Sequence, residues 1–244
     1  MYINNMKRTF TLLTIGFIML MAIGARAQVK SYVGFYGGLS APQSDFGQSN
    51  YNNNKAGFAK KGVVLGIDGA YYFYKNLAIG GTLSFQDQGE LTSNDVNILA
   101  TGYTNSFAAD QATVTGSGRY HSINILLGPQ YSFTYGKFIL DLRASAGIMK
   151  FYSTPLTDIS LIGVTDQTKD FYQRGASPTV FGYSGNASLR YKLSDNVFLT
   201  LRGSYVNSQG PKITTDGRTT DIGRIVTRQP ITVLQTTLGL NFAF

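Results

Sequence analysis

The sequence predicts an all-β protein: an eight-stranded, antiparallel, up-and-down β-barrel that crosses a membrane, with short turns at one end and long loops at the other. Three observations indicate this fold. The first residues are typical of an export signal, eight later segments alternate apolar with small or polar residues, and the chain closes on such a run, 238–244, ending in an aromatic residue. Because successive strand side chains point to opposite faces, the alternation gives each strand one apolar and one polar face.

The N-terminal segment has the three parts of a secretory signal. A pair of basic residues precedes an apolar run of 15 residues, and Ala25 and Ala27 frame an A-x-A cleavage site. Since a helix needs about 20 apolar residues to span a bilayer, this run is too short to be an anchor. We therefore expect residues 1–27 to be removed and residues 28–244 to form the barrel.

The amino-acid composition limits the kinds of site that the protein can contain. The chain of 244 residues has no cysteine and a single histidine, while glycine, tyrosine and phenylalanine supply 28, 16 and 16 residues, which is typical of strands and turns. Without cysteine we expect no disulfide, no thiolate metal site and no lipid-modified cysteine. The formal net charge of +8 becomes +5 when the three basic residues of the signal are removed. We expect no metal, no cofactor and no nucleic-acid partner.

Eight strand-length segments follow the signal, and their spacing is as informative as their number. They span 31–41, 62–73, 77–87, 119–133, 138–152, 180–193, 197–208 and 231–244. The second, fourth and sixth connections are tight turns, whereas the first, third, fifth and seventh are long and polar. Strict alternation of short and long connections is typical of bacterial outer-membrane barrels, whose short turns lie in the periplasm.

Two places fit this pattern less well. In the long connection 88–118, residues 96–99 and 112–115 alternate enough to extend the flanking strands beyond the membrane. Pro129 lies inside a strand, although proline cannot donate a ladder hydrogen bond and a closed barrel has no free edge. We therefore expect a β-bulge at Gly128 and Pro129.

The composition of the two strand faces decides which face meets lipid. One face carries apolar residues and no charge, with Leu83, Leu140, Leu201 and Leu240 among them, while the other is mostly Gly, Ser, Thr and Asn with few charges. A solvated exterior would carry many Lys and Glu, so we place the apolar face in lipid. Aromatic residues near both strand ends predict two interfacial girdles. A soluble, lipocalin-like barrel would use the same alternation with the apolar face inside.

Six charged residues face the predicted interior: Asp68, Asp141, Arg143, Arg190, Lys192 and Arg202. Asp141 and Arg190 lie at similar depth on neighbouring strands, which predicts an ion pair. In a second tier, Asp68 could serve both Arg143 and Arg202. Two roles stay open: the charges fill and stiffen the lumen, or they form a gate or ion path. Eight strands enclose a space just wide enough for side chains, whereas open porins use about 16 to 18 strands.

Catalytic chemistry is not expected. His121 adjoins Ser122, and neighbours on a strand point to opposite faces, so the two cannot form a nucleophile and base without a bulge. The only glutamate, Glu90, lies in a loop. We predict no catalytic residue, and an outer-membrane lipid-modifying enzyme stays as an alternative.

The last long loop is basic and holds Lys212, Arg218, Arg224 and Arg228. Further basic residues lie at the ends of other loops: Lys60, Lys61, Arg119, Lys150 and Arg174. These charges fit contact with lipid phosphates, or they are ordinary solvated loop charges.

Together these motifs resemble the small outer-membrane β-barrel family, often labelled outer membrane protein β-barrel domain or porin family and related in architecture to OmpX and to the membrane part of OmpA. The likeness is carried by the junction 25–28, the opening 32–38, the strand 125–131 and the closing 238–244. It implies that Leu240, Phe242 and Phe244 form the signal for the barrel-insertion machinery. The peptidoglycan-binding domain of full-length OmpA is not seen here, so a cell-wall tethering role is not expected.

We therefore expect a monomeric, non-enzymatic barrel, exported to the cell outer membrane, with a structural or surface-interaction role through its extracellular loops. The expected partners are outer-membrane lipid and lipopolysaccharide, the barrel-assembly machinery and periplasmic chaperones. A small porin-like channel for ions or solutes is the main alternative. The sequence names no ligand.

Overall fold

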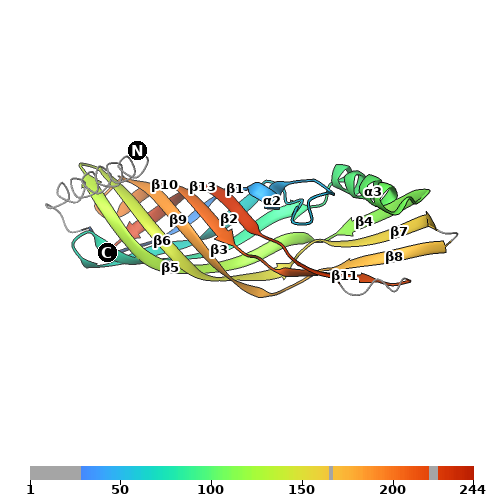
Figure 1. Cartoon of the computed structure of the whole chain (residues 1–244). Helices are drawn as coiled ribbons and strands as arrows, with labels where there is room; N and C mark the ends of the chain where they lie inside the picture. The colour runs from blue at the N-terminus through green and yellow to red at the C-terminus, as the bar shows by residue number, and fades with distance from the viewer. Residues whose placement is uncertain (1–28, 165–166, 220–224) are drawn as a thin grey trace, which may run out of the picture.

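The computed structural model describes residues 29–164, 167–219 and 225–244. Strands dominate it: eight form a barrel, and a second sheet with a helix extends from one end of that barrel (Figure 1). Among the described residues no helix is long and apolar enough to cross a membrane. The expected signal, 1–27, with Ala25 and Ala27, lies outside the described residues.

The barrel contains all eight predicted strands, and each boundary lies within three residues of the predicted one. Around the barrel the order is β1 (Tyr32–Pro42), β13 (Ile231–Ala243), β10 (Val197–Ser208), β9 (Thr179–Lys192), β6 (Phe138–Ser153), β5 (Arg119–Tyr135), β3 (Leu77–Glu90) and β2 (Gly62–Tyr74). All neighbours are antiparallel, and β1 pairs with both β2 and β13, which closes the sheet. The predicted fold class is confirmed.

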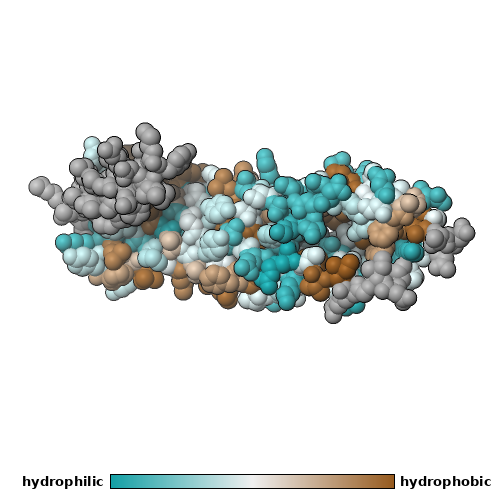
Figure 2. All heavy atoms as spheres, in the orientation of Figure 1, coloured by the Kyte–Doolittle hydropathy of each residue, from teal (hydrophilic) through white to brown (hydrophobic). Residues whose placement is uncertain are grey.

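The two faces of the barrel wall are divided as predicted. Leu83, Leu140, Leu201 and Leu240 are 40–50% exposed on the outside. The arginines of the opposite face are buried in the lumen, with exposed fractions of 0–6% for Arg143, Arg190 and Arg202. A soluble barrel with an apolar interior would reverse this arrangement, so the lipocalin-like alternative is wrong. In Figure 2 hydrophobic surface runs along the barrel, and hydrophilic surface gathers where the barrel passes into the extension.

The long connections form a second sheet beyond the barrel. Its order is β12 (Ile225–Arg228), β11 (Lys212–Gly217), β8 (Gln167–Arg174), β7 (Leu156–Val164) and β4 (Gln111–Ser117). The expected extension at 112–115 lies in β4. We call this sheet, with the helix α3 (Ser93–Phe107) that packs on it and the β1–β2 connection, the extracellular platform.

The helix α3 corrects the sequence analysis, in which residues 96–99 alternate enough to extend a flanking strand. A capping box begins the helix: the Thr92 hydroxyl accepts from the backbone N–H of Asp95, and the Asp95 carboxylate accepts from the backbone N–H of Thr92. Leu99, Tyr103 and Phe107 of α3 pack against the core of the second sheet. This packing stabilises a helix whose apolar pattern is weak in the sequence.

The expected bulge at Gly128 and Pro129 is wrong. Pro129 pairs in register with Ile79, and the register of β5 against β6 is the same before and after it, from Leu127↔Ala146 to Gln130↔Arg143. The missing N–H of proline therefore removes a donor from the ladder without inserting a residue.

A short helix in the first long connection lies over the mouth of the barrel. This helix, α2 (Ser44–Gly47), places Phe46 at 1% exposure, with its ring edge-on to that of Tyr120 at a centroid distance of 5.0 Å. The first loop therefore packs into the mouth of the barrel.

Candidate functional site

The centre of the lumen holds two tiers of paired charge. In the tier nearer the short turns, Arg190 on β9 donates to Asp141 on β6 through two nitrogens, with Nε–Oδ2 at 2.6 Å and Nη2–Oδ1 at 2.9 Å. Both side chains are at most 2% exposed. The guanidinium also lies 4.2 Å from the centroid of the Tyr32 ring. The structure thus brings together the first predicted pair in the bidentate geometry that makes such contacts strong.

The second tier is built on one carboxylate that serves two arginines. Asp68 lies 2.7 Å from Nη1 of Arg143 and 2.6 Å from Nη2 of Arg202. The hydroxyl of Thr82 donates to Asp68 at 2.8 Å. Gly80 makes room for this tier, because a Cβ at that position would lie 2.3 Å from Nε of Arg143. The three charges meet as the sequence analysis predicted.

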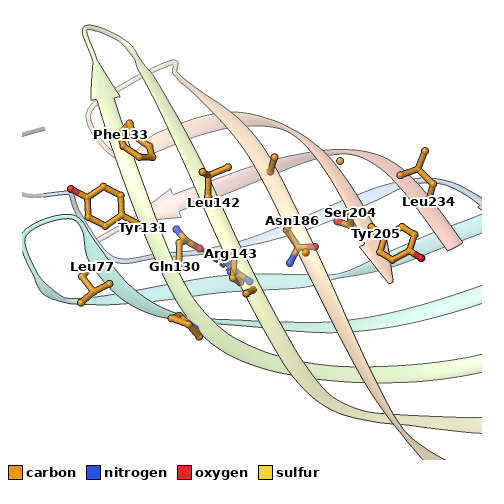
Figure 3. A pocket seen from close by; sticks show the side chains of 15 residues that line it. Leu77, Gln130, Tyr131, Phe133, Leu142, Arg143, Asn186, Ser204, Tyr205 and Leu234 are labelled. Atoms are coloured by element: carbon orange, nitrogen blue, oxygen red, sulfur yellow. Dashed lines mark hydrogen bonds between the residues drawn. The ribbon is translucent and has the colours of Figure 1, made fainter. Parts of the chain in front are cut away.

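Three uncharged side chains join the tiers, and the sequence analysis did not single them out. Gln130 accepts from Arg143 at 2.6 Å and donates to the Tyr72 hydroxyl at 2.7 Å. The Tyr32 hydroxyl donates to Asp68 at 3.1 Å. The alternation of strand faces could have indicated Tyr72 from the sequence. It lies two and four residues along β2 from other positions that face the lumen, and residues spaced by two share one face of a strand. Because the lumen is narrow, large side chains reach one another across it and complete the network. Figure 3 shows Gln130 beside Arg143.

Lys192 does not join this network. Its side chain is 42% exposed at the end of β9 and pairs with Asp195 of the following turn at 2.8 Å. The hydrogen bond and the charge of Lys192 lower the pKa of Asp195. The prediction that Lys192 belongs to the lumen network is wrong, because at the barrel rim its long side chain reaches a turn carboxylate and water.

Apolar clusters fill the lumen on both sides of the charges. On the side of the short turns the cluster consists of Val29, Tyr32, Ala70, Tyr72, Ala78, Ile139, Phe198 and Ala243. On the side of the long loops it consists of Phe46, Ala59, Tyr120, Leu126, Met149, Phe151, Val206, Ile231 and Val233. The interior is therefore filled at three levels, apolar, charged and apolar.

Comparison with known proteins identifies the family. The family described as "Outer membrane protein beta-barrel domain" matches residues 15–227. The chain belongs to this family. A search of curated protein sequences gave no match.

Several solved outer-membrane proteins are similar in structure. Neisserial surface protein A is 15% identical, with a TM-score of 0.47, over 90% of this chain and 100% of that chain. Ail, the attachment invasion locus protein of Yersinia pestis, is 14% identical, with a TM-score of 0.41, over 88% and 100%. The outer membrane protease OmpT from Escherichia coli is 8% identical, with a TM-score of 0.39, over 88% and 97%.

Membership of the outer-membrane barrel family assigns the chain to the outer membrane and orients the barrel. Its short turns face the periplasm, and its long connections, with the extracellular platform, lie outside the cell. The C-terminal residues Leu240, Phe242 and Phe244 are 44%, 45% and 74% exposed on the lipid-facing side at the periplasmic end. Their predicted use by the insertion machinery stays a prediction.

His121 and Ser122 lie on opposite sides of the wall at the outer rim, where Ser122 is buried and His121 is half-buried. The register shifts beside them, but the extra residue is Tyr152 of β6, so the pair is not realigned. Nε2 of His121 instead lies 3.2 Å from Asp87, which also pairs with Arg119 at 3.0 Å.

Four of the basic residues expected at the outer loops have acidic partners. Arg218 pairs with Asp158 at 3.2 Å, Arg174 with Asp216 at 2.7 Å and Lys60 with Asp95 at 2.7 Å. Arg119 pairs with Glu90 at 4.0 Å as well as with Asp87, and Nζ of Lys150 donates to a carbonyl oxygen of the chain. Arg224 lies outside the described residues.

Lys212 and Arg228 face a like charge instead. They are exposed and lie directly opposite each other on β11 and β12. Opposite residues of an antiparallel pair have Cβ atoms about 5 Å apart, so two like charges repel there.

A shallow hollow of about 720 Å³ crosses the outer face of β5, β6, β9 and β10 (Figure 3). Small outward residues form its floor: Pro129, Ala144, Gly185, Ala187 and Gly203. Larger side chains, such as Tyr131, Phe133 and Tyr205, border it. The hollow is part of the lipid-facing belt and holds no cluster of charged groups.

Proposed function

We propose that the protein is a non-enzymatic, closed barrel of the outer membrane that holds a folded extracellular platform for surface interactions. The filled lumen is the observation that carries this proposal. Two buried charge tiers lie between two apolar clusters, so transport would require the lumen to be rebuilt. The platform extends well beyond the barrel, as a scaffold for contact outside the cell would.

The competing function is a small channel for ions or solutes. A path would have to pass Arg190, which is 0% exposed, and Phe46, which is 1% exposed. Purified protein in planar lipid bilayers tests this directly. We expect no stable conductance steps; reproducible, large steps for the wild-type chain would overturn the closed-barrel proposal.

The absence of catalysis is also part of this proposal. His121 is held by Asp87 and lies on the face opposite to Ser122, so the described chain offers no serine–histidine pair at this rim. Loss of a measured lipid-hydrolase activity in a His121→Ala variant would contradict this part.

Lipopolysaccharide phosphate is the partner that Lys212 and Arg228 fit best. An anion between these opposed cations would relieve their repulsion and accept charge-assisted hydrogen bonds. We expect the K212A/R228A double variant to bind lipopolysaccharide more weakly than wild type in a nanodisc assay, and the control K55A, at an exposed lysine of the first long connection, to bind normally. Equal binding by all three proteins would contradict the assignment of lipopolysaccharide phosphate to Lys212 and Arg228.

Export and assembly complete the proposal. Cleavage after Ala27, delivery by periplasmic chaperones and recognition of Phe244 by the insertion machinery would give a monomeric barrel. N-terminal sequencing of the mature protein tests the cleavage site, and an N-terminus other than residue 28 would contradict it.

A further inference from the structure

A cleft of about 460 Å³ opens on the extracellular platform between α3 and the connection from β1 to β2. One wall is the face of α3 that carries Asn97, Thr101 and Asn105, which are spaced four residues apart and therefore form one row. The facing wall carries Asn50 and Asn52. All five residues are exposed, so the cleft is open to the medium outside the cell.

The lining of this cleft is polar and uncharged. Four of its side chains are asparagine amides, each with one carbonyl acceptor and two N–H donors, and Ser49, Thr101 and Ser106 add hydroxyl groups. Ile98 is the only aliphatic side chain among the lining residues, and none of them is charged. Such a surface matches a ligand with many neutral groups that both donate and accept hydrogen bonds.

A buried carboxylate fixes the two walls relative to each other. Asp95 of α3 is 0% exposed and accepts from the Ser49 hydroxyl at 2.7 Å and from Nζ of Lys60 at 2.7 Å. Burial alone would raise the pKa of Asp95, but hydrogen bonds from Lys60, Thr92 and Ser49 outweigh it and hold the pKa below the usual range. The carboxylate is therefore ionised at neutral pH and ties α3 to Ser49 and Lys60 beside the cleft.

An aromatic ring forms part of the cleft beside the helix. Tyr51 lies against Gly102 so closely that a Cβ at position 102 would be 2.1 Å from Cγ of the ring. Tyr51 also packs edge-on against Tyr103, with ring centroids 5.0 Å apart. Glycine inside a helix costs about 1 kcal/mol relative to alanine, and here it permits this approach. The cleft thus combines a fixed aromatic ring with four amides.

We propose that this cleft binds neutral sugar units of a glycan at the cell surface. The inference rests on the proposed surface-interaction function and names a ligand class for it. Sugar hydroxyls donate and accept as the asparagine amides require, and the C–H face of a sugar ring can pack on Tyr51. Phosphorylated, sulfated or sialylated ligands would need cations, yet none lines the cleft, and Lys60, which donates to Ser49 of its lining, is paired with Asp95. An acyl chain would need an apolar lining.

The test uses the full mature chain in phospholipid nanodiscs, because the headgroups of sugar-based detergents would compete with glycans for the cleft. An array of neutral, sulfated and sialylated oligosaccharides is probed, and the strongest neutral glycan is then titrated against the N97A/N105A double variant. Asn94 is an exposed asparagine of the same helix that does not line the cleft, so N94A is the matched control. We expect neutral glycans to bind, the double variant to bind at least tenfold more weakly and N94A to bind as wild type.

Three results would overturn the inference: no glycan retained above empty nanodiscs, a preference for sulfated or sialylated glycans, or equal affinity of the double variant. The wild-type array decides the first two without any variant. A second variant, G102A, must displace the Tyr51 ring and is expected to weaken binding without touching the asparagines. Failure of glycan binding would leave the closed barrel untouched, since conductance tests that claim separately.

Discussion

The barrel and the extracellular platform are built with opposite polarity, although strands run from one into the other. In β6 the outward side chains are apolar, as at Leu140 and Ile148, and Asp141 faces inward. In β7, which follows β6 directly, Ile159 and Leu161 are at most 1% exposed beneath α3. Asp158 and Ser160, which alternate with them along β7, lie half-buried on the other face. The comparison shows where the hydrocarbon core of the bilayer ends along these strands. The apolar face of the sheet changes sides when the medium outside it changes from lipid to water.

The largest effect is expected from the lumen, where polar groups lack access to water. Asp68→Ala leaves Arg143 and Arg202 without their shared carboxylate, and breaking one buried ion pair costs about 3–5 kcal/mol. We expect the folded barrel to lose its heat resistance in gel electrophoresis at a much lower temperature than wild type. The matched control is Asp195→Ala, whose carboxylate is paired but exposed in a turn, and it should melt as wild type. Equal melting of both variants would show that the lumen charges do not hold the barrel together.

The next effect separates the two regions. Leu161→Ala removes a fully buried side chain from the platform core, and such truncations cost about 2–5 kcal/mol. We expect faster proteolysis or hydrogen exchange in α3, with unchanged heat resistance of the barrel. Ile162→Ala is the control, because its side chain is 49% exposed on the opposite face of the same strand. Loss of barrel heat resistance in Leu161→Ala would mean that the two regions are one cooperative unit.

The smallest effect concerns pH and the platform alone. The folded state lowers the pKa of Asp95, so its contribution to stability is complete above the unfolded pKa of about 3.9 and is lost as the pH decreases through the folded value. Protection of α3 from exchange should therefore be constant from pH 8 to about pH 5 and decline only in stronger acid. Asp95→Asn should weaken this protection already at pH 7. A decline between pH 7 and pH 5 in the wild-type chain would contradict the role of Asp95.

The sequence predicted the barrel well because alternation is a local signal. Strand boundaries, the side of each face and the pairing of Asp141 with Arg190 all follow from counting residues along strands with period two. The links through Gln130 and Tyr72 depend on how far side chains reach across the lumen, which counting does not give. Lys192 had inward parity but lies at the rim, where a turn carboxylate is nearer.

The platform was predicted poorly for a different reason. Its strands are short, and their alternation is interrupted by glycine and polar residues, so they are typical of loops when taken alone. The helix α3 had a usable signal in the capping residues Thr92 and Asp95, but its apolar face is narrow and gains stability by packing against β4, β7 and β8. The glycan cleft between α3 and the first connection joins segments distant in sequence and could not be predicted from either.

The reversal of polarity between β6 and β7 is the central claim, and spin-label accessibility tests it most directly. The chain has no cysteine, so single labelled cysteines can replace Leu140, Leu142, Ile148, Asp158 and Ser160 in turn. In lipid bilayers we predict that labels at the first three positions collide with dissolved oxygen and are shielded from a water-soluble nickel reagent, and that labels at 158 and 160 show the opposite. Labels at 140 and 142 that are open to the nickel reagent, or labels at 158 and 160 that are buried in lipid, would contradict the account.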